Sequence, residues 1–274
     1  MIKLCEVLGI SRSGYYKYKD RITPKKENQD KLLCSLITEY HSTFDGILGY
    51  RRMTMFINKL NNKSFSEGYI HRLMKHLDIR ARIRRKKVNR KRIKPEYTKE
   101  NILSRDFTAK APNEKWLTDV TEFSITGDTR KLYLSPIMDL YDNSIIEYEL
   151  SFKNNNHLVF SMFDKAIQKY PYAKPIFHSD RGFQYTGKIF KSKIEETGMT
   201  QSMSRVGKCI DNGPMEGFFG TLKTEMFYGK KYRTFEELRG NIIEYIKFYN
   251  EKRFQKRLGC MAPLEYRNHA SIIA

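Results

Sequence analysis

The sequence lacks the long hydrophobic segments that membrane insertion and secretion require. No apolar run approaches the ~20 residues of a membrane-spanning helix. The opening residues, Met-Ile-Lys-Leu-Cys-Glu, do not resemble a signal peptide, because their apolar stretch is short and includes Glu6. We therefore expect a cytoplasmic protein with no membrane partner.

Cysteine is scarce and scattered. The chain has four cysteines, Cys5, Cys34, Cys209 and Cys260. None belongs to a Cys-x-x-Cys pair, and none lies near a histidine with zinc-finger spacing. This pattern fits reduced thiols in a cytoplasm and does not fit a disulfide framework. No internal repeat is apparent either.

Acidic residues are few relative to basic ones, mainly in the first part of the chain. The 274 residues include 51 Lys and Arg but 31 Asp and Glu, a net charge of +20. Residues 1–115 hold 28 basic and 12 acidic side chains, whereas residues 116–274 hold 23 and 19. This excess favours nucleic acid as partner over solubility alone or a membrane surface. With 40% hydrophobic and 13% aromatic residues, disorder throughout is excluded.

Small all-α modules are expected in the basic part. Residues 1–22 predict a short helix-turn-helix-like segment, in which Ser11 can cap the second helix. Residues 23–80 predict three helices, with Ser64 and Glu67 as a capping box for the third. On a basic chain this favours a helix-turn-helix DNA-binding module, and a helical bundle that binds nothing is the alternative.

A basic linker is expected at residues 81–110. Residues 80–94 contain ten Lys or Arg in fifteen positions. Such a run is either a solvated linker or an arm that lies along phosphates, and its place between two folded regions favours the arm. We expect seven of its side chains to contact DNA: Arg84, Arg85, Lys86, Lys87, Arg90, Lys91 and Arg92.

From Trp116 the pattern changes to that of an α/β fold. The expected strands are 116–125, 131–141, 144–152, 175–180 and 200–204, and the expected helices are 157–170, 187–197, 214–226 and 235–252. An antiparallel meander followed by parallel crossovers is the order of an RNase H-like fold, with a mixed five-stranded sheet and flanking helices. We assign residues 111–230 to this core and 231–274 to a C-terminal helical extension, whose long helix begins at a Thr234–Glu237 capping box.

Three acidic residues lie at positions where catalytic carboxylates are expected. Asp119 lies inside a predicted strand, Asp180 ends another strand, and Glu216 lies in the first turn of a helix. Each also has a non-catalytic explanation. Asp119 could be an ion-paired surface group, Asp180 a turn residue, and Glu216 a charge that favours the helix dipole. Carboxylates converging from different elements are what Mg²⁺ ions need for two-metal phosphodiester cleavage. Spacings of 60 and 35 residues are weak evidence alone.

The residues around these carboxylates carry a more specific pattern. The segments are Asn113-Glu114-Lys115-Trp116-Leu117-Thr118-Asp119-Val120-Thr121, His178-Ser179-Asp180-Arg181-Gly182-Phe183-Gln184-Tyr185, Ser204 to Thr224, and Tyr249-Asn250, Arg253, Leu258-Gly259, Pro263 and Tyr266, with Ser11-Arg12-Ser13-Gly14-Tyr15-Tyr16 and Gly49-Tyr50-Arg51-Arg52 nearer the start. They resemble the long-frame (OrfB) transposases of bacterial insertion sequences, whose core is similar to retroviral integrase. Departures are Gly213 for the usual Ala, Gly217 for Ser and Gln255 for a common His.

The resemblance implies roles for particular residues. Asp119, Asp180 and Glu216 would be the catalytic DDE triad and the ligands of Mg²⁺ or Mn²⁺, with two ions expected. Lys223, seven residues after Glu216, would contact terminal DNA. Asn212 would cap the helix and could contact DNA.

Two further residues of these segments have less specific roles. His178 lies either beside the metals or in a structural hydrogen bond. Trp116 belongs to the core.

The resemblance also implies a function. The chain would cleave DNA at element ends in a metal-dependent reaction and transfer the strand into target DNA. Its partners would be double-stranded DNA, namely terminal repeats and target, further copies of the chain, and an upstream-frame protein or fusion, in a bacterial, nucleoid-associated setting. The alternatives are a catalytically silent DNA-binding protein derived from a transposase, a recombinase with a Tyr nucleophile, and an RNase H-type hydrolase.

Overall fold

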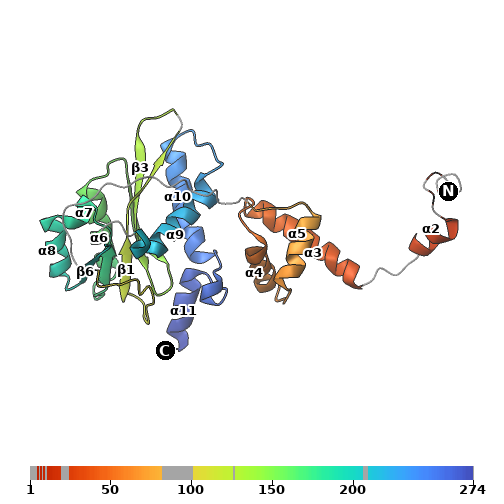
Figure 1. The fold of residues 1–274 in the computed structure, drawn as a ribbon, viewed down its shortest axis with the longest axis horizontal. Coiled ribbons are helices and arrows are strands. Elements are labelled where there is room, and N and C mark those ends of the chain that lie inside the picture. Colours follow the sequence, from red (N-terminus) through yellow and green to blue (C-terminus); the bar gives the residue numbers. More distant parts are fainter. Residues whose placement is uncertain are drawn as a thin grey trace. The chain divides into compact units, whose positions relative to one another are not determined.

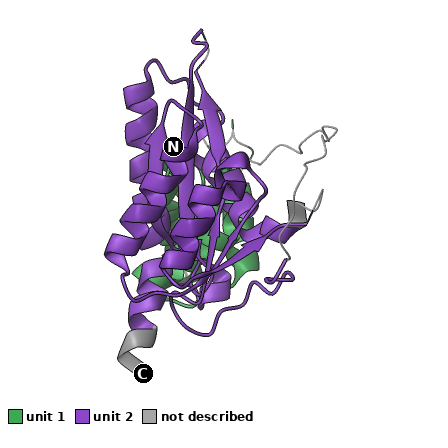
Figure 2. Cartoon of the chain, turned by 90° about the vertical axis from the view of Figure 1, so that its left-hand side faces the viewer, with its two compact units in different colours: residues 1–82 green, residues 83–274 purple. Residues whose placement is uncertain are grey.

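The protein forms two compact units, residues 1–82 and residues 83–274 (Figure 2). The computed structural model describes residues 5, 7, 9, 11–19, 25–81, 101–125, 127–205 and 209–273. The seven basic residues expected to contact DNA, from Arg84 to Arg92, lie outside this range. Within it, no helix is long and apolar enough to cross a membrane.

The first unit is helical, as the sequence predicts. Its described helices are α2 (Arg12–Lys19), α3 (Lys25–Thr43), α4 (Tyr50–Leu60) and α5 (Glu67–His76). Ser11 caps α2 as expected, because its hydroxyl accepts from the Gly14 N–H. The expected cap of α5 at Ser64 is wrong. The helix begins at Glu67, so Ser66 is the capping residue, and its hydroxyl accepts from the Tyr69 N–H.

Helices α3, α4 and α5 are held together by one apolar stripe from each. Leu33 and Ile37 of α3, Met53 and Phe56 of α4, and Ile70 of α5 are buried. Their helical spacing is the pattern from which the three helices were predicted. The remaining faces of these helices are mainly polar.

The second unit is built on one mixed sheet (Figure 1). Its strands are β1 (Lys115–Thr118), β2 (Thr121–Ser124), β3 (Lys131–Asp139), β4 (Ile145–Ser151), β5 (Ile176–Ser179) and β6 (Thr200–Met203). β3 pairs antiparallel with β4 on one edge and with β1 and β2 on the other. β5 pairs parallel with β1, and β6 pairs parallel with β5. The resulting order, β4-β3-β1-β5-β6, is that of an RNase H-like fold.

The sheet has six strands in place of the five expected, because the strand expected at 116–125 is divided in two. The division falls at Asp119 and Val120, between β1 and β2. At this division the Asp119 carboxylate accepts a hydrogen bond from the Val120 N–H, at 2.8 Å. Both halves still lie along the same edge of β3.

Helices cover both faces of the sheet (Figure 1). One face packs against α6 (Asn156–Lys169), α7 (Phe183–Thr186) and α8 (Lys188–Glu196) through a cluster that includes Trp116, Phe163 and Phe177. The other packs against α9 (Gly213–Leu222) and α10 (Phe235–Glu251) through a cluster that includes Leu117 and Phe218. Neighbouring residues of β1 therefore point to opposite cores, which explains its continuous apolar character.

Segments outside the expected core limits also pack into this unit. Leu103, from the expected linker, is buried in the cluster shared with α9 and α10. At the other end, α11 (Pro263–Ile273) places Arg267 against Asp139 and Asp142 near the β3–β4 turn. Helix α10 begins at Thr234, whose hydroxyl accepts from the Glu237 N–H, which confirms the expected cap.

Candidate active site

Two of the three expected carboxylates lie at the ends of adjacent parallel strands. Leu117 of β1 pairs with His178 of β5, so Asp119 and Asp180 follow two residues later on the same edge of the sheet. Neighbouring strands lie about 4.8 Å apart. The carboxyl ends of parallel strands are where α/β sheets assemble ligand sites. The register of the sheet thus brings together residues that are far apart in the sequence.

The electrostatics of Asp119 show that the carboxylates act on one another. Burial, the largest cause, and the charges of Asp180 and Glu216 together raise the pKa of Asp119 to about 8, against the lowering effects of the Val120 N–H and the Lys223 ammonium. Burial also raises the pKa of Asp180, although the Gly182 N–H donates to its carboxylate at 2.9 Å. Such mutual repulsion is a reason for a cation to bind between them.

Gly182 lies close to the Asp180 carboxylate. A Cβ atom on this residue would lie 3.0 Å from an Asp180 carboxylate oxygen and 2.9 Å from the Gln184 amide oxygen. A side chain at this position would therefore shift the Asp180 carboxylate or the Gln184 amide.

Glu216 is presented by the first turn of α9, and its side chain is exposed. The start of α9 is tied to β1, because the Asn212 amide donates to the Thr118 carbonyl at 3.0 Å, one residue before Asp119. Asn212 occupies the capping position before the helix, as expected, but its side chain makes no capping hydrogen bond, and its amide oxygen meets no donor among the described residues. With 3% of its surface exposed, Asn212 is also poorly placed to reach DNA.

Lys223 follows α9 in a π-helical turn, Lys223–Phe227, where an α-helix to 226 was expected. Its ammonium lies 5.1 Å from the centre of the Phe123 ring and lowers the pKa of Asp119. The turn is anchored by Glu225, whose carboxylate accepts from the Arg253 guanidinium and the Tyr245 hydroxyl. π-Helical turns are rare and recur at functional sites.

His178 occupies a structural position. It is fully buried, and its ring nitrogens lie 2.9 Å from the Ser202 hydroxyl and 3.1 Å from the Ser204 hydroxyl. Burial lowers its pKa to about 4, so the ring is neutral at physiological pH. Of the two alternatives for this residue, the structure favours the hydrogen-bonded one. Trp116 is fully buried, as expected.

The fit of a divalent cation rests on the two aspartates. Among the described residues, no three His, Cys, Asp or Glu side chains stand close enough to form a complete metal-binding group. The adjacent Asp119 and Asp180 nevertheless supply hard oxygen donors of the kind Mg²⁺ prefers. The charge of Glu216 raises the pKa of Asp119, which fits a third metal ligand carried by helix α9.

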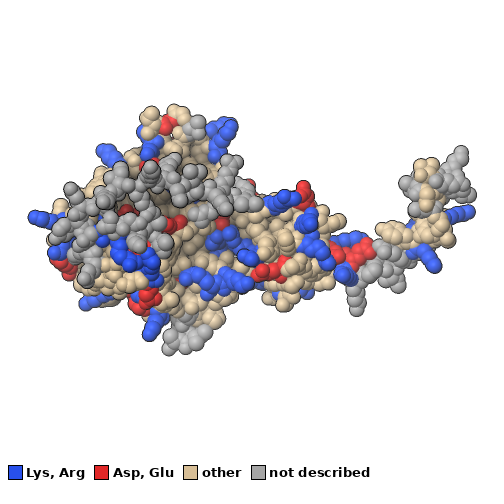
Figure 3. Space-filling view, viewed as in Figure 1, with Lys and Arg blue, Asp and Glu red and all other residues tan. Residues whose placement is uncertain are grey.

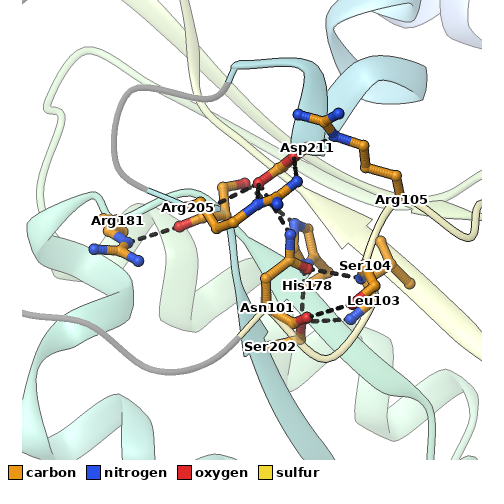
Figure 4. A network of polar contacts seen from close by, with 10 residues as sticks. Asn101, Leu103, Ser104, Arg105, His178, Arg181, Ser202, Arg205 and Asp211 are labelled. Atoms are coloured by element: carbon orange, nitrogen blue, oxygen red, sulfur yellow. Dashed lines mark hydrogen bonds and ion pairs between the residues drawn. The ribbon is translucent and has the colours of Figure 1, made fainter.

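One polar cluster beside these residues was not predicted. Asp211, fully buried just before α9, accepts hydrogen bonds from Arg105, Arg205 and Asn101 (Figure 4). The Asp211 carboxylate thereby connects the segment around Asn101 and Arg105 with the start of α9. Asp211 and Asn212 belong to the segment that carries the family resemblance. Nothing in the sequence, however, indicates that Asp211 pairs with Arg105, which lies 106 residues earlier.

Comparisons with known proteins agree with this architecture. Residues 109–209 and residues 216–270 match models of the integrase core domain, and residues 27–87 match an HTH-like domain. The chain is 39% identical over 267 residues to the putative transposase InsK for insertion sequence element IS150 of Escherichia coli (strain K12), covering 97% of this chain and 93% of that protein. An uncharacterized transposase-like protein of Haemophilus influenzae is 42% identical over 77% of this chain and 95% of its own length.

Among solved structures, the chain is similar to the HTLV-2 integrase catalytic core domain in complex with magnesium, with 16% identity and a TM-score of 0.41 over 58% of this chain and 98% of that chain. The fold is the RNase H-like one deduced above from the strand order. Identity of 39% over nearly its whole length shows that the chain belongs to the insertion-sequence transposases with an integrase core, proteins of DNA transposition.

Proposed function

We propose that this protein cleaves DNA at the ends of a mobile element and joins the freed ends to target DNA. The observation that carries the proposal is the pair Asp119 and Asp180 at adjacent strand ends, with the charge of Glu216 acting on Asp119. A site of mutually repelling carboxylates is costly to fold, so its presence argues for a cationic ligand.

Asp119, Asp180 and Glu216 would hold the divalent ions, Mg²⁺ or Mn²⁺, with two ions proposed. When bound, such ions activate an attacking oxygen and stabilise the charge that develops on the phosphate and leaving oxygen. The two aspartates are carried by the sheet, whereas Glu216 is carried by α9. The Asn212 bond to Thr118 holds α9 against the sheet end and so limits how far Glu216 can move.

The reaction is a pair of in-line displacements at phosphorus. In the first, water attacks the scissile phosphate, the bond to the 3′ oxygen breaks, and a 3′ hydroxyl and a 5′ phosphate result. In the second, that 3′ hydroxyl attacks a target phosphate and releases a target 3′ hydroxyl. The first step hydrolyses a phosphodiester and the second exchanges one phosphodiester bond for another, so neither an external energy source nor a covalent protein–DNA bond is required. The Lys223 ammonium, near Asp119, would hold a phosphate beside the scissile bond.

The partners would be the terminal repeats and a target duplex. Basic side chains cover more of the visible face of the molecule than acidic ones do (Figure 3), and the net charge is +20. Joining two ends requires more than one copy of the chain on DNA, and an upstream-frame partner or fusion would supply further end recognition. A protein of this kind would work on the bacterial nucleoid.

Carboxylate substitutions test the proposal. Asp119→Asn, Asp180→Asn and Glu216→Gln should each abolish cleavage and strand transfer of labelled element ends in Mg²⁺ while DNA binding persists. Glu122→Gln is the matched control, because Glu122 is an exposed glutamate three residues from Asp119 and pairs with Lys131. Cleavage by Asp119→Asn at the wild-type rate would contradict the assignment. Cleavage by none of the proteins, wild type included, would favour the catalytically silent alternative.

A trapped protein–DNA adduct would favour a different chemistry. It would indicate a tyrosine nucleophile, and denaturing gels of the reaction detect it directly.

A further inference from the structure

Three arginines converge beside the carboxylate site, and the catalytic proposal gives none of them a role. Arg105 and Arg205 both bind Asp211: Arg105 Nε at 2.8 Å, and Arg205 Nε and Nη2 at 2.9 and 3.0 Å (Figure 4). Arg181 reaches the same cluster, since its Nε donates to the Ser204 carbonyl at 2.6 Å. Two guanidinium groups therefore share one buried carboxylate, and a third is bound to the residue that precedes Arg205.

The cluster is attached to the catalytic elements by covalent and hydrogen bonds. Arg181 directly follows Asp180, and Asp211 directly precedes Asn212, whose amide binds the residue before Asp119. Arg205 follows β6, which pairs with β5. The guanidinium groups are thus fixed to the same strand ends and helix start that carry the proposed triad.

The arginines retain hydrogen-bonding capacity directed away from Asp211. Side chains of Arg105 and Arg205 are 39% and 49% exposed, although their carboxylate partner is completely buried. Each guanidinium has five N–H donors, and Asp211 takes one from Arg105 and two from Arg205. Arg181 Nη1 is buried and meets no acceptor among the residues that the structure describes.

A purely structural explanation accounts for the cluster incompletely. One bidentate arginine would neutralise Asp211, but two are present, each with solvent-accessible donors, and a third guanidinium has a buried donor without an acceptor among the described residues. A buried carboxylate can hold arginine side chains in fixed positions at the surface, where their planar guanidinium groups bind phosphate efficiently. Little side-chain entropy is then lost when the phosphate binds.

We propose that Arg105 and Arg205, positioned by Asp211, together with Arg181, held by the Ser204 carbonyl, form a binding site for backbone phosphates of DNA next to the acidic triad. This site rests on the proposed function, since it would hold the duplex whose phosphodiester the triad cleaves or attacks. Its ligand is a phosphodiester backbone, from either the element end or the target duplex.

Binding measurements on a cleavage-deficient protein test the site independently of catalysis. The full chain carrying Asp119→Asn is titrated with a labelled terminal-repeat duplex and with an unrelated duplex, at several salt concentrations. The double substitution Arg105→Ala, Arg205→Ala should weaken binding and reduce the salt slope by about 1.8, at about 0.9 for each phosphate that is no longer neutralised. The double substitution Arg105→Lys, Arg205→Lys should keep the wild-type salt slope. The control Arg239→Ala, at an exposed arginine of α10 outside the cluster, should also leave the slope unchanged.

The two duplexes distinguish the source of the phosphate. A loss of affinity restricted to the terminal-repeat duplex assigns the site to the element end, and an equal loss on both assigns it to DNA irrespective of sequence, as target capture requires. An unchanged slope in the folded double variant overturns the site. Because these readouts need no cleavage, they remain valid if the triad proves inactive.

Asp211→Asn separates positioning from simple charge. Removing a negative charge ordinarily strengthens DNA binding, but here it should weaken binding, because the arginines lose their anchor. Asp128→Asn, at a surface carboxylate also paired with an arginine, should not weaken it. Equal or tighter binding by a folded Asp211→Asn protein refutes the positioning role. Should this variant fail to fold by circular dichroism, the exposed arginine variants still decide the proposal.

Discussion

Replacing Asp119 with Asn should stabilise the metal-free protein at neutral pH while it abolishes cleavage. In the folded protein the pKa of Asp119 is about 8, against an ordinary value of 3.8, with burial as the largest cause. Between these pH values the folded protein holds a proton that the unfolded chain has released. Stability therefore falls as pH rises through this range, and it is fully present only below the unfolded pKa.

The size of the effect follows from the pKa difference. Each unit corresponds to about 1.4 kcal/mol, so between the ordinary pKa and neutral pH the wild type loses up to about 4 kcal/mol of folding free energy. Asparagine has a similar shape, keeps an oxygen for the Val120 N–H and carries no charge. For a unit of this size, a gain of that order raises the melting temperature by roughly 8–16 °C.

The assay is thermal unfolding of both proteins in a chelator at about pH 4 and about pH 7. The melting temperatures should agree at the lower pH and differ at the higher one, with the Asp119→Asn protein more stable. Saturating Mg²⁺ should then stabilise the wild type but not the variant. Equal stability of the two proteins at neutral pH would refute the reasoning, because it would mean that the carboxylate is ionised in the fold without cost. Asp128→Asn, at a partly exposed carboxylate paired with Arg130, serves as the control and should show no such gain.

Further predictions concern other parts of the second unit. Glu225→Gln should lower the free energy of unfolding by roughly 3–5 kcal/mol in urea titrations, because it leaves the Arg253 guanidinium buried without its ionic partner. Lys223→Ala should reduce formation of the end complex and strand transfer at limiting DNA, with circular dichroism unchanged, whereas Lys223→Arg should retain most activity. A fragment of residues 101–274 should melt at a higher temperature than one of residues 110–274, because the shorter one lacks buried packing; equal melting would show that residues 101–109 contribute nothing.

The sequence was sufficient to predict the elements that follow from local periodicity. The apolar stripes of α3, α4 and α5 and the continuous apolar character of β1 each predict burial directly. Asp119 and Asp180 were identifiable because aspartate is unusual within or at the end of such strands. Their roles as ligands still depend on the family pattern and await the substitutions described above.

Features that depend on competing hydrogen bonds were not predictable. At the division between β1 and β2 the Asp119 carboxylate accepts from the Val120 N–H, a hydrogen bond that no sequence spacing reveals. The Asn212 side chain stands at the capping position, but its amide N–H donates to the nearby Thr118 carbonyl and its oxygen does not cap the helix. The π-helical turn likewise depends on Arg253 and Tyr245, which follow Glu225 by 28 and 20 residues.

The attachment of α11 to the sheet has a consequence for synthesis. The Arg267 guanidinium binds Asp139 across 128 residues of sequence and Asp142 across 125. At a bacterial elongation rate of about 5–20 residues per second, roughly 6–25 seconds separate translation of the carboxylates from translation of their partner. During this interval Asp139 and Asp142 have no Arg267 guanidinium to neutralise them, so the second unit acquires this stabilisation only after residue 267 has left the ribosome.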